Sequence, residues 1–185
     1  MAELIYLAYG SNLHPLRLQQ RVPSAELLGP VTLSGFRLVF HKIGMDDSGK
    51  CDLLDTGYPA DNAWGVLFRM DESDKPALDI AEGPGYSCEP FPVVYNGEQI
   101  ETMTYLAKPE RQDPAMVPFD WYRELVLIGA RWNSFPDEYI ALIEQVPTQP
   151  DPDLERARLN AELIDKMKNA ENRQPFLTQS RKDAK

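Results

Sequence analysis

Residues 4–13 read LIYLAYGSNL, a short apolar run that passes directly into a glycine turn. The apolar half has the aliphatic and aromatic character of a buried strand. Gly10 permits a tight turn, and Asn12 offers a side chain that can cap a following helix. Backbone N–H groups at such a strand-to-helix turn can bind an anion without a cationic side chain. The stretch therefore predicts a strand and a binding turn.

The same turn has a plainer interpretation, in which it is only the exit from a strand. Gly10 would then take the strained backbone angles, Ser11 or Asn12 would cap the helix, and Tyr9 would fill a gap. The functional interpretation rests on chemistry, because a carboxylate or a developing oxyanion needs several converging donors. The residues alone leave both interpretations open.

A second signal lies at residues 78–86, which read LDIAEGPGY. The pattern predicts the end of a helix, stopped by the Gly-Pro-Gly sequence of residues 83–85. Glu82 would lie in the last turn, where the helix dipole and partial burial both raise the pKa of a carboxyl group toward that of a base. A solvated surface glutamate is the alternative. Together the two signals favour an amide-transfer enzyme with one acid/base.

Composition favours one soluble globular domain. The 185 residues are 43% hydrophobic, and the mean hydropathy is −0.42. Lys and Arg total 19 against 29 Asp and Glu, which gives a net charge of −10 and a pI near 4.7. This acidity disfavours phosphate backbones and anionic lipid surfaces. We therefore expect neither nucleic acid nor a membrane as a partner.

No leader pattern or long apolar run is apparent, so we expect a cytoplasmic protein. The two cysteines lack the spacing of a disulfide framework or a zinc site, and two histidines offer little for a metal centre. Two weaker candidates are a Ser11–His14 nucleophile pair, which has no identifiable third residue, and an acidic metal cluster. The acids of that cluster would be Asp52, Asp55 and Glu89, which are more simply a solvated face.

The first half of the chain is predicted to alternate short strands and helices. Asn12 would cap a short helix that Pro23 ends, and residues 25–40 would form two strands joined by a tight turn. Further strands are expected at residues 51–54 and 63–70, with a bulge at Gly65 in the second. A helix would then begin near Asp71 or Ser73, turn Leu78 and Ile80 inward, and end at Glu82.

The second half contains the clearest local pattern. Residues 91–95 and 99–106 flank Asn96-Gly97, which predicts a hairpin with a two-residue turn. Helices are expected over residues 121–130 and from Pro136 onward. After residue 146 the sequence becomes proline-rich and then charged and helical, so we place one domain at 1–146 and a peripheral extension at 147–185. This order indicates a mixed α+β fold with a curved or closed sheet surrounded by helices.

Five motifs stand out along the chain. They are Tyr9-Gly10-Ser11-Asn12-Leu13, Trp64-Gly65-Val66, Leu78-Asp79 with Glu82-Gly83 and Tyr86, Tyr105-Leu106, and Tyr122 leading into Gly129-Ala130 and Pro136-Asp137-Glu138-Tyr139. In this order they resemble the gamma-glutamylcyclotransferase (AIG2-like) family, and the similarity covers roughly residues 3–145.

The resemblance implies an α+β fold around a small mixed β-barrel, with a polar cavity at one end. It also implies an enzyme that converts a γ-glutamyl amino acid or amine to 5-oxoproline and a free amine, with neither metal nor cofactor. Glu82 falls where the family has its catalytic glutamate, and Tyr122 matches a tyrosine that reaches into the cavity. The substrate-binding strand and turn would be Tyr6, Leu7, Ala8, Tyr9, Gly10, Ser11 and Asn12.

Several points stay open at this stage. Residues 50–56 are more acidic than we expect before the Trp-Gly-Val strand, so the leaving amine is undetermined. The chain could instead be a non-catalytic domain that binds a small ligand or a partner, or an amide hydrolase that releases free glutamate. A homodimer is one assembly that the fold would allow.

Overall fold

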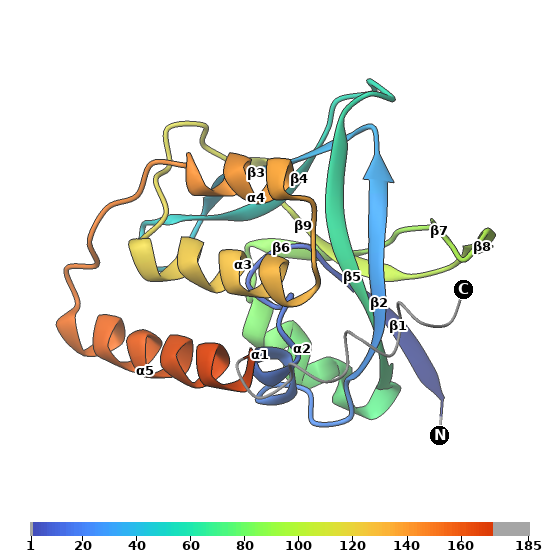
Figure 1. Ribbon diagram of the computed structural model, residues 1–185, viewed down its shortest axis with the longest axis horizontal. Coiled ribbons are helices and arrows are strands. Elements are labelled where there is room, and N and C mark those ends of the chain that lie inside the picture. The colour runs from blue at the N-terminus through green and yellow to red at the C-terminus, as the bar shows by residue number, and fades with distance from the viewer. Residues whose placement is uncertain (1, 172–185) are drawn as a thin grey trace.

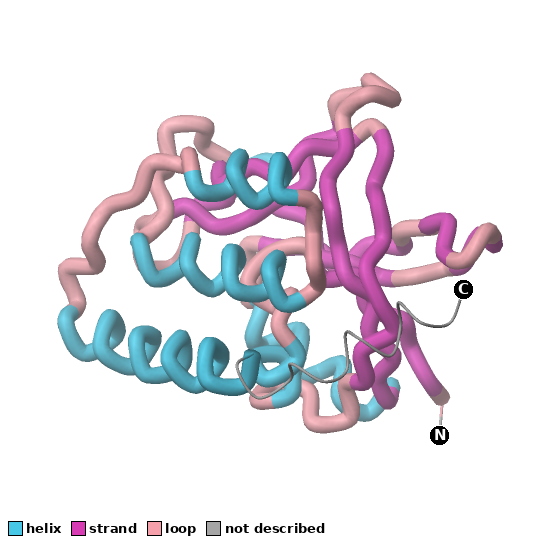
Figure 2. Tube along the Cα trace, in the orientation of Figure 1, coloured by secondary structure: helices cyan, strands magenta, loops and turns pink. Residues whose placement is uncertain are grey.

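A five-stranded mixed sheet organises the computed structural model, which describes residues 2–171 (Figure 1). The strand order is β2-β5-β1-β9-β6, and only the β1–β9 pair is parallel. Two-stranded sheets formed by β3-β4 and β7-β8 flank it. The helices gather on one side of the sheets, away from the β7–β8 hairpin (Figure 2). The mixed α+β class expected from the sequence is therefore confirmed.

The first strand lies at the centre of this sheet. β1 spans Glu3–Ala8, as predicted, and pairs antiparallel with β5 (Asn62–Asp71) so that Tyr6 faces Phe68 across the ladder. Leu7 and Ala8 have no exposed surface. Because β1 is flanked on both sides, the turn that follows it leaves from the middle of the sheet.

Residues 25–40 do form two strands, but these strands pair with different neighbours. β2 (Glu26–Ser34) lies beside β5, whereas β3 (Phe36–Ile43) pairs with β4 (Gly49–Asp55). Gly35, with φ of 86°, carries the chain from one sheet to the other.

The bulge expected at Gly65 is absent, and that prediction was wrong. Gly65 pairs regularly with Val31, and the irregularity of this ladder lies between Leu27 and Gly29. A Cβ built on Gly65 would approach Leu7 Cδ1 to 2.6 Å. Gly65 therefore makes room for the Leu7 side chain and does not mark a β-bulge.

The helix before Glu82 is present but shorter than expected. A 3-10 turn (Glu72–Asp74) leads into α2, which spans Lys75–Glu82. Leu78 is buried as predicted, but Ile80 is 82% exposed, so the prediction for Ile80 was wrong. Two residues span about 200° of a helix, which places Leu78 and Ile80 on opposite faces.

The predicted hairpin is confirmed at its turn. β7 (Val93–Tyr95) and β8 (Glu98–Ile100) are joined by Asn96 and Gly97, with φ of 53° and 84°. The second strand does not continue to residue 106. The chain instead leaves the hairpin, and β9 (Met103–Ala107) enters the main sheet between β1 and β6 (Tyr86–Pro90), a strand that the sequence did not predict.

A closed barrel is not found in residues 2–171, so that part of the predicted fold is not confirmed. The main sheet ends at β2 and β6, and β4 approaches β9 without forming a ladder. At this junction the Ala107 N–H donates to the carboxylate of Asp52 at 2.9 Å instead of to a backbone carbonyl. The Asp52 carboxylate thus accepts the hydrogen bond that a backbone carbonyl of β4 would accept if the sheet were closed.

The first helix, α1 (Pro15–Gln19), begins later than the sequence suggested. Its cap is His14, whose Nδ1 accepts from the Leu16 N–H at 3.1 Å, so the prediction of Asn12 as the cap was wrong. α1 also ends at Gln19, before Pro23. Because His14 caps α1, the Asn12 side chain is available for other contacts.

The remaining helices agree with the expected positions. They are α3 (Asp120–Trp132), α4 (Asp137–Glu144) and α5 (Leu154–Glu171). α5 packs along α3 (Figure 1), where Ile164 and Met167 meet Leu125 and Ile128 in an apolar cluster. The helix expected in the C-terminal extension is therefore present, and its buried apolar side chains pack on α3. Residues 172–185 of that extension lie outside the described residues, and the domain boundary at 146 stays a prediction.

The start of α5 is also fixed by polar contacts. The carboxylate of Asp151 accepts from Trp121 Nε1 and from Arg156 Nε, both at 2.7 Å. The Arg156 guanidinium holds the pKa of Asp151 down to about 2. None of the described helices has the length and apolar character needed to cross a membrane.

Replacement of Met167 by alanine tests the packing of α5. Met167 has no exposed surface, so Met167→Ala leaves a cavity that costs about 2–5 kcal/mol of unfolding free energy. Leu159→Ala is the matched control on the same helix, because Leu159 is 52% exposed. Urea denaturation measures both. Equal stability of Met167→Ala and Leu159→Ala would contradict this account of α5.

Candidate active site

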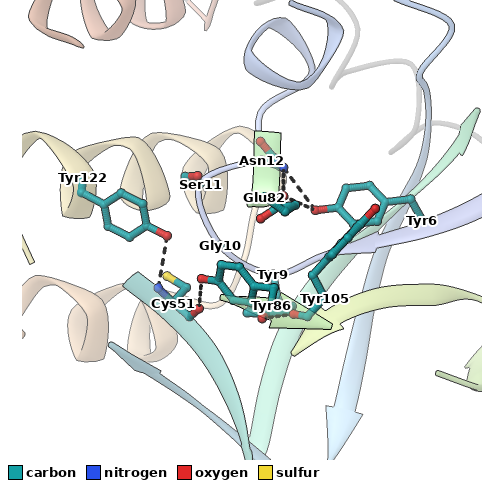
Figure 3. Close-up of a pocket in the computed structure, with 10 residues that line it drawn as sticks. All are labelled: Tyr6, Tyr9, Gly10, Ser11, Asn12, Cys51, Glu82, Tyr86, Tyr105 and Tyr122. Carbon is teal, nitrogen blue, oxygen red and sulfur yellow. Dashed lines mark hydrogen bonds between the residues drawn. The ribbon is translucent and has the colours of Figure 1, made fainter. Parts of the chain in front are cut away.

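One pocket opens beside the glycine turn, with about 280 Å³ of empty space (Figure 3). Its walls come from β1, the turn after it, β4, the end of α2, β6, β9 and α3. The lining residues are Tyr6, Tyr9, Gly10, Ser11, Asn12, Cys51, Glu82, Tyr86, Tyr105 and Tyr122.

The pocket brings together most of the residues proposed from the sequence. Glu82 and Tyr122, far apart in the chain, both face the turn that follows β1. Two proposed substrate-binding residues, Leu7 and Ala8, do not line it. Successive side chains of a strand point to opposite faces, so Leu7 enters the core while Tyr6 points to the pocket.

Sequence reasoning missed three lining residues as site residues. Tyr86 and Tyr105 occur in the motifs that carry the family resemblance, and that was the signal that could have found them. Cys51 carries no such signal. It reaches the pocket only because β4 curves toward Gly10, a long-range contact that the local sequence does not predict.

Glu82 is held through one of its two carboxylate oxygens. Asn12 Nδ2 donates to Oε1 at 2.7 Å, and the Tyr6 hydroxyl donates to the same oxygen at 3.3 Å (Figure 3). Within residues 2–171, Oε2 has no hydrogen-bond donor. The carboxylate is therefore oriented by one oxygen and leaves the other for a ligand.

The surroundings of Glu82 raise the pKa of its carboxyl group. Burial is the main cause, because it disfavours the charged form. Three cations oppose this effect, Arg21 most strongly, followed by Arg17 and Lys42. The raised pKa expected from the sequence agrees with this environment, and it moves the group toward the range of an acid/base at neutral pH.

The turn after β1 presents free backbone donors to the same space. Its Leu13 N–H bonds back to the Gly10 carbonyl at 3.2 Å. Among the described residues, the N–H groups of Gly10 and Ser11 have no acceptor. A Cβ on Gly10 would lie 2.8 Å from Cys51 Cβ, closer than real contacts allow. Gly10 therefore lets the turn lie against β4 while its N–H remains available.

The tyrosines of the pocket differ in whether their O–H groups already donate a hydrogen bond to the protein. Tyr86 donates to the Cys51 carbonyl at 2.6 Å, and Tyr105 donates to the Asp79 carboxylate at 2.5 Å. Tyr122 instead accepts from the Cys51 N–H at 3.1 Å, so its own O–H can donate to a ligand. Burial raises the pKa of Tyr122 well above its usual value, which keeps this donor protonated.

The weaker candidates do not assemble into sites. His14 turns its Nδ1 to the start of α1, and burial lowers its pKa to about 4, so it is not positioned as a base for Ser11. Burial raises the pKa of the Cys51 thiol to about 12, which makes it a poor nucleophile. The described residues contain no metal-binding group of His, Cys, Asp and Glu side chains.

Comparison with known proteins finds similar sequences over most of the chain. A family model described as the AIG2-like family matches residues 62–143. Gamma-glutamylcyclotransferases from mouse and human are each 28% identical over 178 residues, and these matches span about 90% of this chain and of each relative. Over residues 62–143 the chain resembles the AIG2-like family, and over most of its length it resembles the gamma-glutamylcyclotransferases. The resemblance to gamma-glutamylcyclotransferases carried by the sequence motifs is therefore confirmed.

A solved structure supports the fold assignment. A protein named gamma-glutamyl cyclotransferase superposes with a TM-score of 0.74 at 24% identity, and the match covers 89% of this chain and 99% of the other. Because the match covers most of both chains, the two proteins share one fold.

Replacement of Gly10 by alanine tests the close approach of the turn to β4. The added Cβ would overlap Cys51 Cβ, so we expect Gly10→Ala to lose about 1–3 kcal/mol of stability through overpacking. Ser11→Ala serves as the control, because it changes the neighbouring residue without adding volume. Thermal unfolding of both variants measures the difference. A Gly10→Ala protein as stable as the wild type would show that the turn does not depend on this contact.

Proposed function

We propose that this chain is a gamma-glutamylcyclotransferase that converts a γ-glutamyl amino acid to 5-oxoproline and the free amino acid. The observation that carries the proposal is the juxtaposition in one pocket of Glu82, with its raised pKa, and two backbone N–H groups after β1 that have no acceptor within residues 2–171. The names of the curated relatives agree with this activity.

The reaction needs little from the protein, because the nucleophile is part of the substrate. The α-amine of the glutamyl group is tethered to the γ-carbonyl carbon, and attack closes a five-membered ring. The pocket must fold the substrate into this conformer and exclude alternatives. The tyrosine walls of the pocket support that role.

Proton transfer is assigned to Glu82. Its Oε2 takes a proton from the α-ammonium, and the freed amine forms the new C–N bond at the γ-carbon. The N–H groups of Gly10 and Ser11 stabilise the oxyanion of the tetrahedral intermediate, with the Tyr122 hydroxyl as a further donor. Protonated Glu82 then gives its proton to the departing nitrogen, and the original amide C–N bond breaks. The carboxylate takes the second proton from the ring nitrogen and passes it to the released amine, which leaves as an ammonium group. The carboxylate is regenerated in each turnover.

The charges around the pocket favour a leaving group that carries a carboxylate. Arg17 and Lys42 are only 8% and 4% exposed, and neither forms an ion pair among the described residues. Lys42 Nζ lies 4.6 Å from the ring centroid of Tyr86, a pocket residue. A γ-glutamyl amino acid has one more negative charge than the corresponding γ-glutamyl amine. In a chain with a net charge of −10, these cations give the site a complementary field.

Replacement of Glu82 by glutamine tests the reaction. The introduced amide keeps the shape of the side chain but cannot accept the proton, so we expect 5-oxoproline release to fall about 10²–10⁴-fold while the fold is preserved. Mass spectrometry of the products also distinguishes lactam formation from hydrolysis, which would give free glutamate. Glu89→Gln, at an exposed glutamate of β6, is the control and should retain full activity. Undiminished turnover by Glu82→Gln would refute the assignment of Glu82.

A pair of substrates tests the preference for a carboxylate. γ-Glutamyl-alanine and γ-glutamyl-ethylamine differ by that group, and we expect kcat/KM to favour the first by about tenfold, equivalent to ~1.4 kcal/mol. Lys42→Met should reduce this ratio, whereas Lys168→Met, which removes an exposed cation from α5, should not. Equal or better turnover of the amine would contradict the proposed preference.

A further inference from the structure

We propose that Arg21 is a positioning residue for Glu82, which it orients through the side-chain amide of Asn12. Arg21 lies between α1 and β2, outside the pocket lining, and no sequence motif marks it. The inference rests on the proposed function only where it concerns turnover. The effect on the carboxylate itself can be measured without catalysis.

Three hydrogen bonds connect the residues. Arg21 Nη1 donates to Asn12 Oδ1 at 3.0 Å. On the other side of the same amide, Asn12 Nδ2 donates to Glu82 Oε1 at 2.7 Å and to the Tyr6 hydroxyl at 3.2 Å. Asn12 is only 3% exposed, so water competes little for these bonds. A guanidinium outside the pocket is thereby linked to the carboxylate inside it.

Donor and acceptor chemistry gives this linkage a direction. A guanidinium can only donate, so Asn12 must turn its oxygen toward Arg21. The amide nitrogen of Asn12 then points to Glu82, which can only accept when ionised. A flipped amide would oppose NH₂ to the guanidinium and oxygen to the carboxylate, two repulsive contacts. Arg21 therefore selects the orientation in which Asn12 holds Glu82.

The orientation of Asn12 decides which carboxylate oxygen is used. Asn12 and Tyr6 both donate to Oε1, and within the described residues Oε2 receives no donor. Without Arg21, the amide could rotate and withdraw its donor from Oε1. The carboxylate would then lose the contact that presents Oε2 to the substrate.

A merely structural role for the Arg21 side chain is less consistent with its contacts. The backbone N–H of Arg21 already fixes this segment by donating to the Leu18 carbonyl at 2.9 Å, and that bond does not need the side chain. In residues 2–171, the guanidinium forms no ion pair within 4 Å, and its side-chain hydrogen bond goes to Asn12. Its charge therefore acts mainly on the pocket.

Arg21 also acts on Glu82 through its charge. The other cations that face the carboxylate are Arg17, from α1, and Lys42, from β3, and both have smaller effects on its pKa. The ionisable groups on the remaining sides have pKa values raised by burial and stay neutral near pH 7; these are Tyr6, Tyr9, Cys51, Tyr86 and Tyr122. Removal of Arg21 should therefore raise the pKa of Glu82 further.

A direct titration of Glu82 tests the inference. ¹³C NMR of carboxyl-labelled protein follows the Glu82 signal, which is assigned by its loss in Glu82→Gln. We expect the midpoint to move to higher pH in Arg21→Gln and to stay closer to the wild type in Arg21→Lys, which keeps the charge. Arg69→Gln, which removes an exposed arginine paired with Glu26, should leave it unchanged. An Arg21→Gln midpoint equal to that of the wild type would overturn the proposal.

Kinetics test the route through Asn12. We expect Arg21→Gln to lower kcat by about tenfold with little change in KM, as for loss of a hydrogen bond to a charged group. In an Asn12→Ala background the same substitution should add little, because the connection is already broken. A full additional loss there would overturn the route through Asn12. If the wild type released no 5-oxoproline, the proposed function would fail, whereas the NMR titration would still decide the role of Arg21.

Discussion

The site depends on the hydrogen bond from Asn12 to Glu82. This contact joins the turn after the central strand to the end of α2, two segments 70 residues apart in the chain. The bond fixes one carboxylate oxygen, while burial raises the pKa of the whole group. An acid/base with one oxygen held and the other open is suited to moving a proton in both directions. The rest of the fold brings this pair together beside a row of free backbone donors.

The sheet explains why these parts meet. β1 is held on both sides by β5 and β9, so the turn at Gly10 leaves from a rigid position. β4 then curves over this turn until Cys51 is in contact with Gly10. Between β4 and β9, the Asp52 carboxylate accepts from the Ala107 N–H, and no backbone ladder joins the two strands. The sheet therefore curves around a pocket without closing into a barrel.

Much of this arrangement was predictable from local patterns. The apolar runs of β1 and β5, the Asn96-Gly97 turn and the helix that ends at Glu82 each follow from short-range preferences. The predictions failed where a distant contact overrode a local one. Asn12 is a good helix cap in isolation, but its amide bonds to Glu82 instead. The packing of α5 on α3 is another long-range contact, because only two apolar residues of this charged helix, Ile164 and Met167, are buried there. Cys51 was missed because its contact with Gly10 is long-range. Arg21 was missed because its connection to Glu82 passes through the Asn12 side chain.

The most direct test of the central claim is a crystal structure with 5-oxoproline bound. We expect the lactam in the pocket beside the glycine turn, with its ring nitrogen within hydrogen-bond reach of Glu82 Oε2 and its carbonyl oxygen facing the N–H groups of Gly10 and Ser11. A lactam bound elsewhere, or in this pocket with its ring nitrogen turned away from Glu82, would contradict it.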